Sequence, residues 1–121
     1  MQLLDIQGFS YEERDDLLPC LGTALADCGG WILCRKAVSP SAIELRLDIQ
    51  LRAVLDLYAG IVSSGLELTR SSHLMLTDLC NCRKNFTDPA ELGQVVTIRL
   101  EINFLEDVPY QPLLIANRIP A

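Results

Sequence analysis

Apolar and polar residues alternate strictly in two segments of the chain, residues 43–49 and residues 95–104. A period of two is typical of a β-strand with one buried face and one face in water. The apolar positions are Ile43, Leu45, Leu47 and Ile49 in the first segment and Val96, Ile98, Leu100, Ile102 and Phe104 in the second. We therefore predict that both segments lie in one sheet, their aliphatic sides under a pair of helices. The length of the second suggests pairing along most of a sheet edge.

Apolar residues recur at helical spacing in three other segments. They are Leu17, Leu18, Leu21 and Leu25 in the first, Leu51, Val54, Leu55, Tyr58, Ile61 and Val62 in the second, and Leu74, Met75, Leu79 and Cys82 in the third. Ser10 and Glu13 have the spacing of a capping box for the first helix. Ser71 or Ser72 is expected to cap the third helix.

Shorter strands are predicted at residues 2–6, 31–38 and 66–69. Gly8 is expected to turn the chain after the first strand, because glycine adopts positive φ at little cost. For the same reason Gly29-Gly30 and Gly65 should end the first two helices.

The turn Ser39-Pro40-Ser41 joins residues 31–38 to 43–49 as an antiparallel hairpin. In this hairpin, Arg35 and Lys36 are expected to face the acidic residues of the second strand, which would help to fix its register.

The order of strand, helix, hairpin, helix and strand across residues 2–69 predicts an α+β fold with the ferredoxin-like β-α-β-β-α-β sandwich. An extra helix and a long C-terminal antiparallel strand extend it. Residues 108–121 contain three prolines around an apolar stretch, and predict an irregular apolar arm. No linker or repeat divides the chain, so residues 1–121 are interpreted as a single domain.

Composition and net charge limit the kinds of molecule that this protein is expected to bind. The chain is 50% hydrophobic and only 6% aromatic, which indicates a core filled mainly by aliphatic side chains. The net charge is −6, and among residues 1–28 six acids accompany Arg14 alone. Nucleic acids and anionic membranes are therefore not expected as partners, because both require clustered cations. No export leader or membrane span is recognised, and the cytoplasm is the expected location.

Five cysteines, Cys20, Cys28, Cys34, Cys80 and Cys82, form an odd set without a regular framework, so reduced thiols are expected.

Two passages resemble ACT-type ligand-binding domains. Asp5-Ile6-Gln7-Gly8 is similar to the acidic residue and turn glycine before that family's first helix. Leu25-Ala-Asp-Cys-Gly-Gly-Trp-Ile-Leu33 is similar to its passage from helix through glycine into a strand. The resemblance covers residues 2–69. Gln7 departs from it, since the family commonly has proline there, and so do residues 70–121, which extend the simple domain.

The resemblance implies subunits paired side by side or face to face. It also implies a small ligand such as an amino acid near the first strand–helix turn, where Gly8, Phe9 and Ser10 lie. Backbone N–H groups at a helix start can bind a carboxylate. Four acidic residues at positions 12–16 would repel one, and Gly8 and Ser10 could equally be a turn residue and a cap.

The single histidine, His73, limits the catalytic arrangements, because any Ser-His-Asp or Cys-His set would be built around it. One alternative function is therefore a small enzyme that uses Cys34, Cys80 or Cys82 as nucleophile and His73 as base. A surface or capping histidine is the other interpretation of His73.

Cys80 and Cys82, together with His73, are the only cluster of metal-ligand residue types. Two residues apart on a helix, the thiols point about 200° away from each other. We therefore expect one buried and one exposed thiol, and neither a metal nor a cofactor.

These observations predict a non-enzymatic regulatory or assembly domain that acts as a homodimer or larger homo-oligomer and binds a small molecule or a partner protein. A structural protein–protein adaptor is a further alternative.

Overall fold

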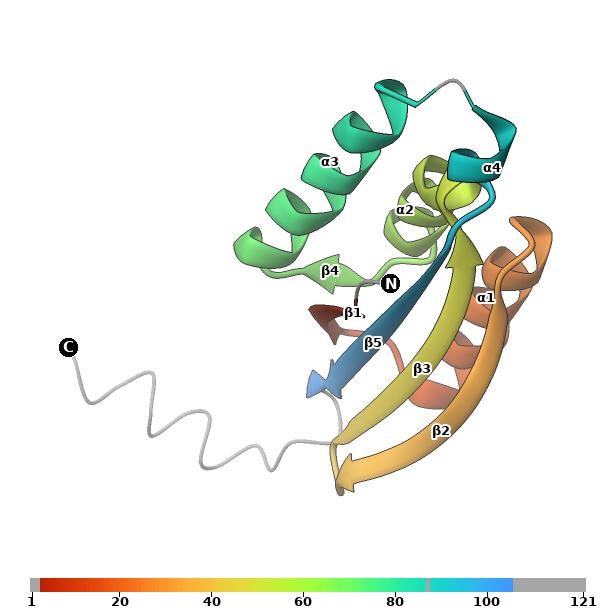
Figure 1. The fold of residues 1–121 in the computed structure, drawn as a ribbon. Coiled ribbons are helices and arrows are strands. Elements are labelled where there is room, and N and C mark those ends of the chain that lie inside the picture. The colour runs from red at the N-terminus through yellow and green to blue at the C-terminus, as the bar shows by residue number, and fades with distance from the viewer. Residues whose placement is uncertain (1–2, 87, 106–121) are drawn as a thin grey trace, which may run out of the picture.

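The computed structural model describes residues 3–86 and 88–105, and its elements follow one another as an α+β chain (Figure 1). They are β1 (Leu3–Ser10), α1 (Arg14–Asp27), β2 (Trp31–Ser39), β3 (Ala42–Gln50), the 3₁₀ turn η1 (Leu51–Ala53), α2 (Val54–Ser63), β4 (Glu67–Leu68), α3 (Arg70–Lys84), α4 (Pro89–Leu92) and β5 (Val95–Phe104). The α+β class is confirmed. The arm predicted at residues 108–121 lies outside the described ranges. Within those ranges, no helix is long and apolar enough to cross a bilayer.

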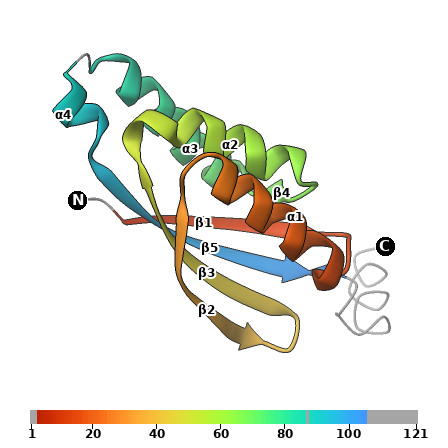
Figure 2. The ribbon, with the colours of Figure 1, turned by 90° about the vertical axis from the view of Figure 1, so that its right-hand side faces the viewer.

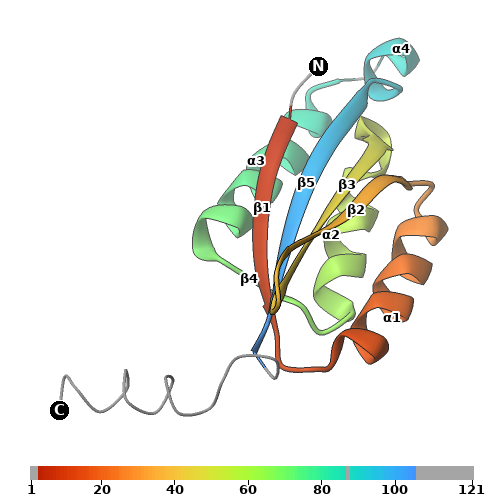
Figure 3. The same ribbon diagram turned by 90° about the horizontal axis from the view of Figure 1, so that it is seen from below.

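The strands form one five-stranded sheet in the order β2-β3-β5-β1-β4. β5 is antiparallel to β3 and parallel to β1, and β4 is antiparallel to β1. Seen from below, β5 runs between β1 and β3 along their whole length (Figure 3). The prediction that residues 43–49 and 95–104 share one sheet is therefore confirmed.

The ferredoxin-like arrangement is not confirmed. In that arrangement the third strand lies beside the first, whereas here β5 separates β3 from β1. The expectation that residues 95–104 pair along a sheet edge is wrong, because β5 has a hydrogen-bonded neighbour on both sides. A central position suits β5 because its inward side chains are buried, with Ile98, Leu100, Ile102 and Phe104 fully inaccessible.

All helices of the described residues lie on one side of the sheet, which leaves the other side open (Figure 2). The core forms between these layers from aliphatic side chains, as the composition predicted. α1 and α2 approach closely where Gly60 faces Ala24, since a Cβ at Gly60 would lie 3.2 Å from the Ala24 Cβ. The hairpin, α2 and β4 occur where the sequence predicted them, and positive φ at Gly29 and Gly65 ends α1 and α2.

The start of the chain differs from the prediction. β1 continues to Ser10, so Gly8 lies inside a strand rather than at a turn. α1 begins at Arg14 and its N-cap, Glu13, makes no side-chain capping bond, so the predicted capping box is wrong. Ser10 is buried, and its Oγ accepts a hydrogen bond from the Glu12 N–H while donating to the Glu12 carbonyl. Pairing with β5 as far as Phe104 explains why the strand extends so far.

The cap and buried face of α3 also differ from the prediction. Thr69 is the N-cap and accepts a hydrogen bond from the Ser72 N–H. The buried positions are Ser72, Leu76, Leu79 and Cys80. Ser72 is buried because its Oγ accepts a hydrogen bond from the N–H of Gln7 in β1, and this contact sets the face that α3 turns inward. Leu74 and Cys82 are consequently exposed.

Replacing Gly8 should destabilise the fold. A Cβ at Gly8 would lie 2.9 Å from Cγ of the buried Leu66 and 3.1 Å from the Glu67 carbonyl oxygen. We expect Gly8→Ala to lower the free energy of unfolding by about 1–3 kcal/mol, as overpacking does. The matched control is Gly22→Ala in α1, where a Cβ meets nothing within 4 Å. It should raise stability by about 0.5–1 kcal/mol through helix propensity. Urea denaturation measures both, and equal effects would contradict the packing argument.

Candidate functional site

The predicted ligand residues Gly8, Phe9 and Ser10 do not form a strand–helix turn. Gly8 packs against Leu66, and the Ser10 hydroxyl bonds to the backbone of Glu12. Phe9 alone borders a cavity, one of about 520 Å³, together with Val62, Gly65, Leu66, Glu67, Leu68 and His73. The structure therefore brings two sequence candidates together, Phe9 and His73, but leaves Ser10 occupied elsewhere.

His73 is half-buried and bonded to Tyr58 across the α2–α3 contact. Its Nδ1 lies 2.6 Å from the Tyr58 hydroxyl oxygen, and the two rings meet edge to face at 5.7 Å. A neutral imidazole with its proton on Nε2 can accept the tyrosine proton in this hydrogen bond. Thr69 rather than His73 caps α3, and the partly exposed His73 links α2 and α3 through Tyr58. No cysteine lines the cavity, so no cysteine–histidine pair forms in it.

The cysteines lie apart from one another. Cys80 is buried and Cys82 is exposed, as their spacing predicted, and Cys34 is exposed on β2. Burial raises the pKa of the Cys80 thiol, although Arg83 and Lys84 oppose this effect. A raised pKa disfavours the thiolate and therefore nucleophilic chemistry. In the described ranges no three His, Cys, Asp or Glu residues are grouped to hold a metal ion.

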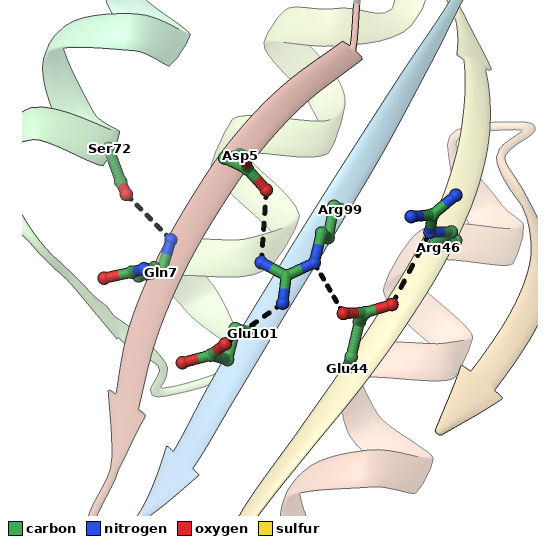
Figure 4. A network of polar contacts seen from close by, with 7 residues as sticks. All are labelled: Asp5, Gln7, Glu44, Arg46, Ser72, Arg99 and Glu101. Carbon is green, nitrogen blue, oxygen red and sulfur yellow. Dashed lines mark hydrogen bonds and ion pairs between the residues drawn. The ribbon is translucent and has the colours of Figure 1, made fainter. Parts of the chain in front are cut away.

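Charged residues on the open side of the sheet form a network around Arg99 of β5 (Figure 4). The guanidinium donates to Asp5 of β1 at 3.2 Å, to Glu101 at 3.3 Å and to Glu44 of β3 at short range. Arg46 reaches Glu44 from the other side at 3.5 Å. Hydrogen bonds with Asp5 and Glu44 raise the pKa of Arg99.

This network stabilises the sheet. Glu44 is only 6% exposed although no helix within residues 3–86 and 88–105 covers its side of the sheet. A buried carboxylate requires paired charge and hydrogen bonds, and here Arg99 supplies both. Each charged side chain of the network has a partner of opposite charge, and its three carboxylates and two guanidinium groups together carry a formal charge of −1, so this centre offers no free cation for an anionic ligand.

Among the described strands, β2 is the most exposed. It forms the edge of the sheet, bonded to β3 on one side, and each of its nine residues is exposed. Its large apolar side chains are 45–51% exposed, namely Trp31, Ile32, Leu33 and Val38. Figure 2 shows β2 at the lower border of the sheet, although Arg35 borders a cavity with residues of α1. Lys36 lies opposite Glu44 as predicted, but Arg35 lies opposite Leu45 rather than an acid.

Sequence reasoning identified this strand but not its exposure. Apolar runs such as Trp31-Ile32-Leu33 are typical of buried strands. The signal that could have identified an edge was the pair Arg35-Lys36 in the middle of the run, because charged residues, lysine above all, mark edge strands. The Arg99 network could have been inferred from the alternating charged positions in residues 44–48 and 97–101.

Removing Arg99 should cost more stability than removing Arg46. We expect Arg99→Met to lower the free energy of unfolding by about 2 kcal/mol, because it leaves the Glu44 carboxylate without its main partner. Arg46→Met is the matched control. Its side chain is 47% exposed, so its loss should cost less than about 1 kcal/mol. Chemical denaturation of both variants measures this, and equal losses would show that Arg99 is not the main partner of Glu44.

Thiol labelling should separate the cysteines by burial. At about pH 8, below the ordinary thiol pKa, we expect Cys20 on α1 to react quickly with iodoacetamide because it is exposed. Cys28 and Cys80 should react much more slowly, because burial raises the pKa of both thiols. Peptide mass spectrometry of the native protein measures each rate. Rapid labelling of Cys80 would favour the cysteine-enzyme hypothesis instead.

Comparisons with protein-family models, with curated proteins and with solved structures find no match to this chain. The resemblance to ACT-type domains therefore stays a prediction. Among the described residues, the exposed edge of β2 is the feature that bears most directly on function.

Proposed function

We propose that this chain is a non-enzymatic assembly domain that pairs with a second copy of itself through the free edge of β2. One observation carries this proposal: a nine-residue strand is exposed along its entire length and bears four large apolar side chains. An edge strand of this kind presents unpaired N–H and C=O groups, which are a template for another strand.

A second β2 is a suitable partner. Antiparallel pairing about a two-fold axis is self-complementary, and it would continue each five-stranded sheet into that of its partner. The backbone groups of both edges would become bonded, and the apolar side chains at residues 31–33 would be covered by strand residues of the other copy. The hydrophobic contribution comes mainly from these side chains.

The charges on β2 restrict the register of this pairing. A two-fold axis at Arg35 or Lys36 would set like charges opposite each other, which is unfavourable. An axis near Cys34 places Arg35 and Lys36 beside apolar residues of the other copy instead. We therefore favour a register centred near Cys34.

The assembly function does not depend on the Gly8–Ser10 segment or on a cysteine nucleophile. The ACT-type resemblance also implies side-by-side subunits, and this part of it agrees with the proposal. A structural adaptor that uses β2 to bind a different protein is the competing interpretation, and it predicts a monomeric chain in isolation.

The mass of the protein in solution tests the proposal. Light scattering at about 100 micromolar should give twice the 13.4 kDa chain mass. Ile32→Lys should raise the dimer dissociation constant more than about tenfold, because it introduces charge into the apolar part of the interface. The matched control is Leu55→Lys on α2, since Leu55 is 46% exposed and Ile32 is 45% exposed. The control should remain dimeric.

A single-chain mass for the wild-type protein would exclude self-pairing and leave the adaptor. Equal weakening by both lysine variants would place the interface elsewhere. Circular dichroism of each variant establishes that it is folded before its mass is interpreted.

A further inference from the structure

The cavity of about 520 Å³ that Phe9 and His73 border lies beside β4, at the edge of the sheet opposite β2. β4 runs along the outer side of β1, between the end of α2 and the start of α3 (Figure 1). Sites for small ligands commonly have volumes of about 300–1,000 Å³ and combine apolar walls with a few polar groups. This cavity has a suitable size, and a ligand can enter from solvent because its lining residues Phe9, Val62 and Glu67 are exposed.

Apolar groups form most of the cavity wall. Leu66 and Leu68 belong to the buried core, and Val62 of α2 is 48% exposed. Gly65, which has a φ of +95°, contributes only backbone to the wall. These surfaces favour a ligand with an apolar body.

The charged groups at the cavity are acidic. Glu67 lines it, and the Glu12 carboxylate lies beside the lining residue Gly65, since a Cβ at Gly65 would be 3.8 Å from the Glu12 oxygens. No lysine or arginine lines the cavity, and no described residue forms an ion pair with either glutamate. Arg70, three residues after Glu67, is not among the lining residues. The two carboxylates therefore carry uncompensated negative charge, which attracts a cation.

Phe9 is a second group that favours a cation. It lies directly opposite Glu67 in the β1–β4 pair, so the two side chains are neighbours on one face of the sheet. Phe9 is also 38% exposed. An ammonium group bonded to Glu67 can therefore lie over the face of the Phe9 ring, where the ring quadrupole attracts it.

His73 of α3 adds a hydrogen-bond donor to the cavity wall. With Nδ1 accepting the proton of Tyr58, the neutral imidazole carries its own proton on Nε2. Within the described ranges, no residue accepts a hydrogen bond from Nε2. Tyr58 does not itself line the cavity, so it holds the ring without occupying the site. The Nε2–H group is therefore available to an oxygen atom of a ligand.

We propose that this cavity binds a small organic amine with an apolar body and one oxygen atom that accepts a hydrogen bond from His73. The ammonium group pairs with Glu67 over the Phe9 ring, and the apolar body packs on Val62. A carboxylate on the ligand would be repelled by Glu67 and Glu12, so an amine binds more tightly than the corresponding amino acid. The ligand therefore differs from the amino acid that the ACT-type resemblance implies. The proposal does not depend on β2 pairing, because it uses the opposite edge of the sheet.

Tyramine is the probe that tests this ligand class, because it has a primary amine, an aromatic body and a phenol oxygen. L-tyrosine adds a carboxylate to the same molecule, and 4-ethylphenol lacks the amine. His73 is the only histidine of the chain, so NMR spectra of the full protein identify its ring resonances directly. We expect tyramine to shift these resonances with a dissociation constant below about 1 millimolar. The other two compounds should bind at least about tenfold more weakly.

Two pairs of variants at exposed positions locate the site. Glu67→Gln should weaken tyramine binding at least about fivefold, because it removes the charged partner of the amine. Asp27→Asn at the end of α1 makes the same change in net charge and should leave binding unchanged. Val62→Lys should abolish binding, because its ammonium group would occupy the cavity beside Glu67. The matched control is Leu55→Lys on the same helix, since Leu55 is 46% exposed and Val62 is 48% exposed.

Other outcomes would overturn the proposal. His73 resonances that do not move with 10 millimolar tyramine would show that the cavity does not bind this class of ligand. Tyrosine or 4-ethylphenol binding as tightly as tyramine would contradict the role of the carboxylates. Equal weakening by Glu67→Gln and Asp27→Asn would mean that tyramine responds only to the net charge of the protein. A single-chain mass in samples that bind tyramine would refute the assembly function and leave this inference intact.

Discussion

The position of β5 in the centre of the sheet is the constraint on which the rest of the structure depends. β1 and β3 share no hydrogen bonds, and each is bonded to β5 along its length. Residues 95–104 therefore join the β2–β3 hairpin to the β1–β4 pair, and give the helices a continuous floor of aliphatic side chains. A central strand supplied by the last of the described elements also makes many contacts between residues distant in sequence, which slows folding relative to local pairing.

The same constraint explains the Arg99 network. Placing β5 between β1 and β3 brings its open-side residues within reach of acids from both neighbours, and Arg99 bonds to Asp5 on one side and Glu44 on the other. The ion pairs of Arg99 with Asp5 and Glu44 therefore form only because β5 lies between β1 and β3.

The sequence predicted the elements better than their arrangement. Strict alternation in residues 43–49 and 95–104 identified two strands and their buried faces, because a period of two reflects burial of one face directly. Which strands lie beside these two depends on pairing between residues distant in sequence, and local patterns do not report it. For this reason β5 was expected at an edge of the sheet. The same limit applies to α3. Its buried face is set by a hydrogen bond from Gln7 to Ser72, residues that lie far apart in sequence. Of the candidate site residues, Phe9 and His73 border one cavity, which local patterns could not indicate for the same reason.

Placing β5 in the centre leaves two unequal edges. β4 covers only part of β1, whereas β2 exposes its whole length. β2 also has features that disfavour pairing with unrelated strands. These are the charged residues Arg35 and Lys36 and the irregularities in register near Leu33 and Val38. A strand meant only to stay in water would not combine them with four large apolar side chains. In the self-pairing that we propose, their combination would favour one register, since charges and bulges penalise other alignments while the apolar residues stabilise the correct one.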